Sequence, residues 1–233
     1  DMAWGAALLV SLAIMTAVMA LSFFLIARLV FKSDLTSTIA TLGIGLIAQG
    51  VTQLVFGSNV VSLELPLPNW YAQVGSMRIT SYDMAVLVVT AASVGLLYLL
   101  IERPRVSIAF RAVSANPFAS RVCGLSLRRI HLFSWVVAGL LGLVAALLIV
   151  PTTFLSSTSV SSFMLQAFAA AVVGGFSSLP GAVVGGVFIG VLMNLLSFYV
   201  AAEFTNTYLL MVILLTLNVF PKGVLATRGG ARV

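Results

Sequence analysis

Charged side chains are scarce in this chain: Asp, Glu, Lys and Arg make up 8% of its 233 residues, whereas 61% of the residues are hydrophobic. A soluble globule of this size must still cover its surface with polar groups, and so apolar a chain cannot do so. The mean hydropathy of +1.17 points the same way. The composition therefore excludes a soluble domain and predicts an integral membrane protein.

Cysteine and histidine each occur once, as Cys123 and His131. A single cysteine cannot form an internal disulfide, and these two residues alone cannot complete a metal site. We interpret His131 as a membrane-interface residue and Cys123 as a small packing residue. We therefore expect no metal site and no cofactor in this chain.

Ionisable side chains are also missing from the apolar runs, apart from positions near their predicted ends. Proton-coupled carriers usually need such a group at membrane depth, so this pattern argues against a proton pump or a redox enzyme. The sequence shows no nucleophile–base pair and no G-x-x-x-x-G-K-[ST] phosphate loop. We expect a protein that is not an enzyme, has no catalytic residues and does not bind ATP through such a loop.

Long apolar runs are what the chain does contain. A helix needs about 20 apolar residues to cross a bilayer, and seven runs approach or exceed that length: 3–30, 35–56, 82–101, 131–150, 163–176, 182–200 and 207–220. The predicted fold class is all-α, a polytopic transmembrane helix bundle of about seven segments forming one domain over residues 1–233. The fifth run is short enough to be a partial or broken span. A polar loop is expected over residues 57–81.

The basic residues indicate the orientation of the bundle. If residue 1 lies outside and the chain crosses seven times, eleven of the twelve Lys and Arg residues fall inside, and only Arg78 falls outside. Positive charge in short loops marks the cytoplasmic side of a membrane protein. The same distribution explains the pI near 10.1 without a nucleic-acid partner. We expect a multi-pass protein of the bacterial cytoplasmic (inner) membrane with a cytoplasmic C-terminus.

The central segment, residues 102–130, is the most basic part of the chain and is predicted to be cytoplasmic. Asn116 is a favoured helix N-cap, Pro117 suits the first helical position, and Gly124 suits the position just after the helix. Spacing places Phe118, Val122 and Leu125 on one face, with Arg121 left for a partner. Two interpretations stay open: a short helix on the membrane surface, or one that inserts into a groove on a soluble protein.

Glycine is concentrated between residues 174 and 190, with Gly181 four residues before Gly185 and Gly186 four before Gly190. Such spacing lets two helix backbones approach closely. The alternative is that Gly174 and Gly175 break the fifth helix beside a substrate path, where irregular backbone is tolerated inside a membrane.

Four segments resemble the high-affinity branched-chain amino acid permeases of the ABC type. Residues 111–125 resemble the loop R-A-V-x-x-N-P-E-A-A-x-x-x-G-I, which docks the ATPase in that family. The other three are 174–182 (G-G-x-G-S-x-P-G-A), 220–225 (R-P-Q-G-L-L) and 39–43 (I-A-T-I-G). That family has two types of permease, and the Pro-Gly pair of residues 180–181 is typical of the first type. The related urea and short-chain amide permeases also have this pair.

The chain departs from that family at several positions. Phe118 stands where the family has Glu, and Ser177 replaces a glycine. The family's first two helices, with their N-F-A-H-G-type signature, are absent before Asp1, so a fragment of a longer permease is expected.

The resemblance implies an ATP-driven importer of branched-chain or other small apolar amino acids. Its implied partners are two ABC ATPase subunits, a second and usually different permease subunit, an external or periplasmic substrate-binding protein, and the lipid bilayer. The implied ATPase-coupling residues are Arg111, Asn116, Pro117, Phe118, Ala119, Arg121 and Gly124. Residues expected to line the translocation path, or else to join helices by hydrogen bonds or close packing, are Thr41, Gln49, Gln53, Gln166, Gly174, Gly175 and Asn194.

Other functions remain open at this point. A secondary carrier or channel for a small neutral solute would need no ATPase, and inverted repeats would favour it. Import of urea or amides is a second alternative. A structural or assembly protein of the membrane is a third.

Overall fold

A computed structural model provides the fold, and its described residues form two compact units, Asp1–Ser157 and Thr158–Val233, each of which is treated by itself. The residues that the structure describes are 4–26, 34–57, 70–74, 77–152, 159–176, 178–200, 202–220 and 223.

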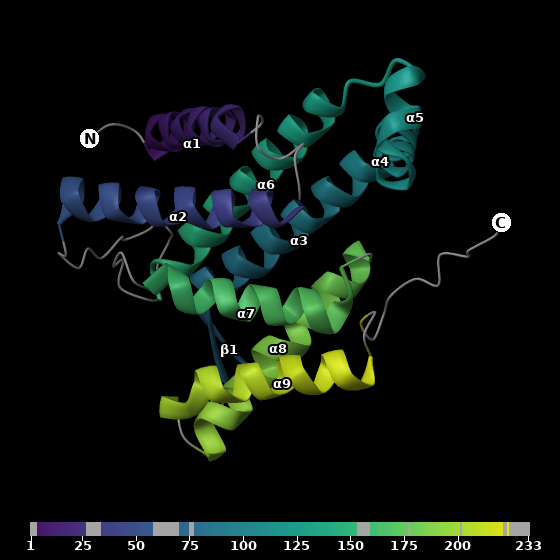
Figure 1. The fold of residues 1–233 in the computed structure, drawn as a ribbon. Helices are drawn as coiled ribbons and strands as arrows, with labels where there is room; N and C mark the ends of the chain where they lie inside the picture. Colours follow the sequence, from purple (N-terminus) through teal and green to yellow (C-terminus); the bar gives the residue numbers. More distant parts are fainter. Residues whose placement is uncertain are drawn as a thin grey trace. The chain divides into compact units, whose positions relative to one another are not determined.

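The first unit consists of helices and one hairpin (Figure 1). Its helices are α1 (Trp4–Ile26), α2 (Asp34–Phe56), α3 (Ser81–Glu102), α4 (Pro104–Ala115), α5 (Pro117–Val122) and α6 (Leu127–Ile149). Strands β1 (Tyr71–Val74) and β2 (Met77–Thr80) lie between α2 and α3 and pair antiparallel, with Val74 opposite Met77. The predicted all-α class is confirmed, and the hairpin is an addition within a segment that we expected to be a loop.

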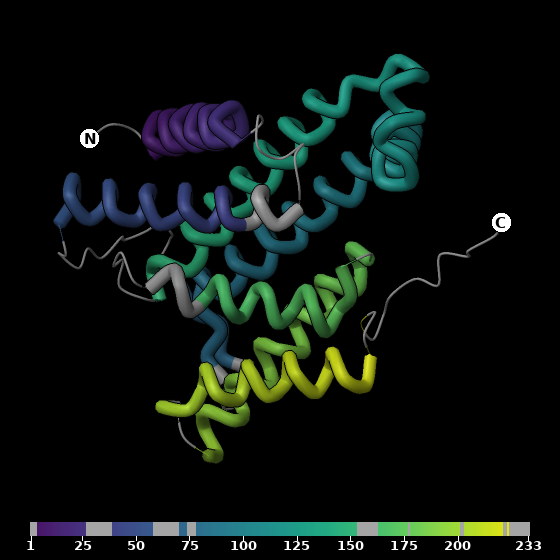
Figure 2. The backbone as a smooth tube through the Cα atoms, viewed as in Figure 1, coloured from purple at the N-terminus to yellow at the C-terminus, as the bar shows by residue number. Residues whose placement is uncertain are grey.

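The second unit contains three helices that double back on one another, as the tube in Figure 2 shows. They are α7 (Ser159–Gly174), α8 (Leu179–Tyr199) and α9 (Thr205–Val219), with a 3-10 turn at Ala202–Phe204 before α9. Their shared core joins α7 to both other helices through seven buried side chains: Ala169, Val172, Val173, Ile189, Met193, Leu209 and Ile213.

Five of the helices are long and apolar enough to cross a membrane: α1, residues 39–56 of α2, α3, α6 and α8. The shorter α7 has 16 residues, a length of about 24 Å at 1.5 Å per residue, against a hydrocarbon core of about 30 Å. This confirms the prediction that the fifth run is short. Whether α7 and the 15-residue α9 complete a crossing stays a prediction.

Large apolar side chains cover the outside of these helices. No residue of the membrane-length windows of α2 and α3 is buried, and Leu54 is 88% exposed. In water such a surface would be an aggregation hazard, whereas lipid tails solvate it without cost. The exposure therefore agrees with the composition in requiring a bilayer as solvent.

Helices α1 and α6 form the best-packed pair of the first unit. Phe23 is buried, and its ring lies 6.3 Å from that of Trp135 in an edge-to-face arrangement. Gly139 leaves room for the side chain of Met19, which a Cβ at that position would displace. At one end of the pair, the Arg128 guanidinium lies 4.8 Å from the centre of the Phe24 ring, a cation–π distance. The two helices therefore run antiparallel.

Three predicted boundaries need correction. Helix α6 begins at Leu127, ahead of the expected start at His131, because its first turn tolerates Arg128 and Arg129 outside the apolar run. Helix α7 ends at Gly174, where Gly175 takes a positive φ of 92°. Residues 179–181, expected in a turn, form the first turn of α8, because proline is compatible with a helix start.

Candidate functional site

The central basic segment connects two membrane-length helices. Helix α3 ends at Glu102 and α6 begins at Leu127, and both qualify as spans. Helices α4 and α5 therefore lie in the connection between two membrane-length helices, after the end of α3 and before the start of α6 (Figure 1).

Asn116 joins α4 to α5. Its backbone N–H donates to the carbonyl of Ala112, 3.0 Å away, and closes α4. Its side-chain Oδ1 accepts from the backbone N–H groups of Phe118 and Ala119, both at 3.0 Å, and so caps the start of α5. Pro117 occupies the first turn, where a missing N–H costs no hydrogen bond. The predicted N-cap is confirmed.

The other end of α5 is closed by Gly124. This residue has φ +82°, which an L side chain rarely adopts. The N–H of Leu125 donates to the carbonyl of Ser120, and that of Gly124 donates to the carbonyl of Arg121, both at 3.0 Å. This pair of bonds is the Schellman motif, which satisfies carbonyls at a helix end. The predicted role of Gly124 is confirmed.

The two faces of α5 differ in their surroundings. Ser120 is buried, and its hydroxyl donates to the carbonyl of Asn116 at 2.9 Å. Phe118 and Val122 are 76% and 74% exposed. Leu125 is half-buried, so the expected apolar face continues onto the protein only at that end. An amphipathic turn therefore shows two large apolar side chains on its outer side.

The remaining predicted coupling residues lie close to this face in the chain. Ala119 and Arg121 are exposed on α5, and Arg111 is exposed on α4. Cys123, the C-cap of α5, is also exposed, so its interpretation as a packing residue is wrong.

Close packing of α7 against α8 depends on missing side chains. A Cβ at Gly181 would lie within 3.0 Å of the carbonyl oxygen of Gly174, and one at Gly185 would lie within 3.0 Å of that of Ala170. Gly181 and Gly185 therefore pack as the spacing predicts. Gly190 has nothing within 4 Å of such a Cβ, so the second predicted pair, Gly186 and Gly190, does not extend this contact.

The end of α7 also meets the chain after α9. Gly223 has φ +88°, and a Cβ on it would lie within 3.0 Å of the nitrogen and Cα of Gly175. Gly175 and Gly223, which belong to two of the segments singled out in the sequence, thus lie backbone to backbone. The sequence contained both glycines but no signal that they meet.

The expected path residues are divided between the two units. Thr41, Gln49 and Gln53 lie on α2, whereas Gln166 lies on α7 and Asn194 on α8. Gln53 and Asn194 are exposed, and the other three are half-buried. Gly174 and Gly175 form the packed helix end described above. Their role in lining a path stays a prediction.

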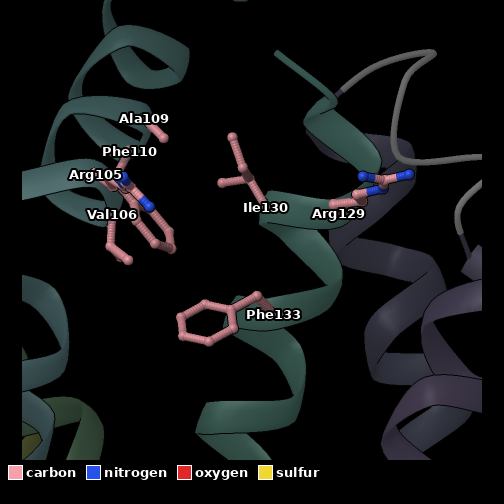
Figure 3. A pocket seen from close by; sticks show the side chains of 7 residues that line it. All are labelled: Arg105, Val106, Ala109, Phe110, Arg129, Ile130 and Phe133. Atoms are coloured by element: carbon pink, nitrogen blue, oxygen red, sulfur yellow. The ribbon is translucent and has the colours of Figure 1, made fainter. Parts of the chain in front are cut away.

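One pocket was not anticipated from the sequence. It lies between α4 and α6 and holds about 210 Å³ (Figure 3). Its lining residues are Arg105, Val106, Ala109, Phe110, Arg129, Ile130 and Phe133. The ring centroids of Phe110 and Phe133, both in the lining, lie 6.2 Å apart with the ring planes tilted by 55°. Among the described residues, no three His, Cys, Asp or Glu side chains are grouped so as to hold a metal ion.

Comparison with known proteins gives a consistent result. Residues 2–219 match the family described as "Branched-chain amino acid transport system / permease component". The chain is 29% identical over 198 residues to the high-affinity branched-chain amino acid transport system permease protein LivH of Salmonella typhimurium, covering 82% of this chain and 64% of that protein. It is 27% identical over 197 residues to the protein of the same name from Escherichia coli, with the same coverage.

A third relative, from another organism, gives a similar identity over a shorter stretch. The probable branched-chain amino acid transport permease protein LivH of Methanocaldococcus jannaschii is 31% identical over 135 residues, which are 55% of this chain and 43% of that protein. The chain thus spans less than two thirds of the length of these relatives. No solved structure matches it.

Proposed function

Since the chain belongs to the family of branched-chain amino acid transport permease components, we propose that it is the membrane subunit of an ATP-driven importer. The proposed substrates are branched-chain or other small apolar amino acids, which the names of the relatives support. The proposed partners are ABC ATPase subunits, a second permease subunit and an external substrate-binding protein. The eleven basic residues on one side of the predicted threading favour a cytoplasmic segment 102–130 and C-terminus.

The outer face of α5 supports an ATPase-docking role. Phe118 and Val122 are apolar side chains exposed outside the membrane-length helices, where contact with water would be unfavourable. Covering them in a groove of a soluble partner removes that cost, and helix-in-groove recognition uses such anchors. Apolar contact at Phe118 would replace any polar contact made by the family's glutamate.

The caps of α5 suit it to transmit a push. Both of its ends are closed by hydrogen bonds, so a force on Phe118 moves the helix as a body instead of unwinding it. Asn116 carries that movement into α4, and the short link from Leu125 to Leu127 carries it into α6. ATP-driven closure of the ATPases would thereby reach a membrane span directly.

The single cysteine provides a test of orientation and docking. Cys123 is exposed at the end of α5, so a membrane-impermeant maleimide should label it in inside-out vesicles and not in right-side-out vesicles. Adding the ATPase subunits should slow the labelling of inside-out vesicles. A Cys123→Ser variant reports any labelling elsewhere. Labelling from the outside would overturn the proposed orientation.

Variants of the exposed face test function. Phe118→Ser with Val122→Ser should abolish ATPase co-purification and ATP-dependent leucine uptake by the full transporter, with membrane insertion unchanged. Arg78→Gln, which removes a charge from the hairpin, is the matched control and should retain both. Uptake that survives the double change would refute docking through this face, and ATP-dependent uptake of urea but not leucine would refute the substrate class.

A further inference from the structure

The pocket between α4 and α6 has an apolar lining. Ile130 and Phe133 of α6 project toward α4, where Val106, Ala109 and Phe110 form the opposite wall (Figure 3). Nearly all of its lining atoms are carbon. A space of about 210 Å³ is below the usual size of a site for a drug-sized solute, but it can take part of a flexible chain.

The walls of this pocket lie near the ends of two membrane-length helices, α3 and α6. Arg105 follows the last residue of α3 by three positions, and Phe133 is the seventh residue of α6. Both helices are membrane-length spans. If α3 and α6 cross the bilayer, the pocket lies near the level at which the hydrocarbon gives way to headgroups.

Positive charge dominates around the pocket. Residues 102–131 contain six arginines and one acid, Glu102, whose carboxylate accepts from the Tyr98 hydroxyl. Arg105 and Arg129 are exposed at the pocket, and neither has a carboxylate partner in the part of the chain that the structure describes. The Arg129 guanidinium extends away from the gap (Figure 3). Arg105 is therefore the charge nearer to the pocket, and Arg129 lies on the adjoining wall.

We propose that this pocket binds an anionic phospholipid, with part of an acyl chain against Val106, Ala109 and Ile130 and the phosphate beside Arg105. An apolar slot alone would accept any tail, whereas Arg105, which pairs with no carboxylate among the described residues, favours a negative headgroup. Basic pockets between membrane helices bind anionic headgroups in this way. The inference requires only that α3 and α6 cross the bilayer, and it is independent of the docking role of α5.

The test uses the full-length permease, purified in mild detergent and offered equal amounts of dioleoyl phosphatidylglycerol and dioleoyl phosphatidylcholine. Native mass spectrometry counts the lipids retained. Wild type should retain phosphatidylglycerol in preference to phosphatidylcholine. Arg105→Gln should weaken that retention about fivefold, the effect of about 1 kcal/mol for one arginine near the membrane surface. Ala109→Phe, which fills the slot, should remove the bound lipid altogether.

Controls separate this site from general attraction to charge. Arg78→Gln removes an arginine of the hairpin and should leave retention unchanged. Inorganic phosphate at the same concentration should not displace the lipid, because it lacks the acyl chain. Equal retention of the two lipids, or retention that neither Arg105→Gln nor Ala109→Phe lowers, would overturn the proposal. Normal leucine uptake by a variant that has lost the lipid would leave the transport proposal standing.

Discussion

Gly223 packs its backbone against that of Gly175, and both residues have positive φ values, +88° and +92°. A Cβ on Gly223 would fall within 3.0 Å of the Gly175 nitrogen and Cα. The end of α7 is therefore held by a residue that follows α9. Backbone conformation and lack of space both keep Gly223 free of a side chain, and the positive φ of Gly175 favours glycine there.

Gly223→Ala is expected to destabilise the second unit. The left-handed conformation alone costs an L residue about 1–2 kcal/mol, and overpacking adds about 1–3 kcal/mol. Thermal unfolding of the purified protein in detergent measures the loss. Gly57→Ala is the matched control, because Gly57 has φ +70° but open space around it. An equal loss in both variants would show that the contact with Gly175 contributes nothing.

Alanine at Gly185 and at Gly190 should have different effects, although both residues lie in α8. At Gly185 the added methyl group would meet the Ala170 carbonyl and should destabilise the protein by about 1–3 kcal/mol. At Gly190 nothing lies within 4 Å, and alanine is the better helix former, so stability should be unchanged or slightly higher. Unfolding in a denaturing detergent series compares them, and similar losses would contradict the helix contact.

Asn116→Ala should loosen α5 without disturbing the spans. Loss of a side-chain cap typically costs about 1 kcal/mol, and here one oxygen serves two N–H groups. Amide hydrogen exchange at residues 118–123 should accelerate several-fold. Asn116→Asp retains the accepting oxygen and should restore protection, whereas no difference between the two variants would show that the cap is dispensable.

The start of α3 should depend on Thr80, the last residue of the hairpin. Its hydroxyl accepts from the backbone N–H of Asp83 at 3.3 Å, and its own N–H donates to the Asp83 carboxylate at 2.9 Å, which together form a capping box at the start of α3. Thr80→Val should cost about 1 kcal/mol, and Thr80→Ser should be close to neutral. Exchange rates at residues 81–84 report the change, and protection unaltered in Thr80→Val would contradict it.

The local structure of α5 could be predicted from the sequence because every signal was local. Asn116, Pro117 and Gly124 each set the backbone within a few residues, and each did so as expected. The face of the helix was less predictable. Spacing grouped Phe118 with Val122 and Leu125, but only packing decides which side of such a group turns inward, and Ser120 was buried instead.

Features that join distant segments were beyond sequence reasoning. The α4–α6 pocket brings Phe110 of α4 next to Phe133 of α6, and the glycine contact joins residues 175 and 223. The sequence contained a weaker signal for the hairpin. Gly75 and Ser76 separate the stretches 71–74 and 77–80, and a glycine-containing pair at such a position is typical of a hairpin sequence. Its cross-strand contact, Arg78 over the ring of Tyr71 at 5.8 Å, needs the register that pairing supplies.

The contact between Arg128 and Phe24 has a consequence for topology that does not depend on counting charges in loops. Phe24 is near the last residue of α1 and Arg128 is near the first residue of α6, so these two helix ends lie together. If α1 and α6 both cross the bilayer, the chain between them crosses it an even number of times. Two helices, α2 and α3, meet that condition, whereas a single additional or missing crossing would not.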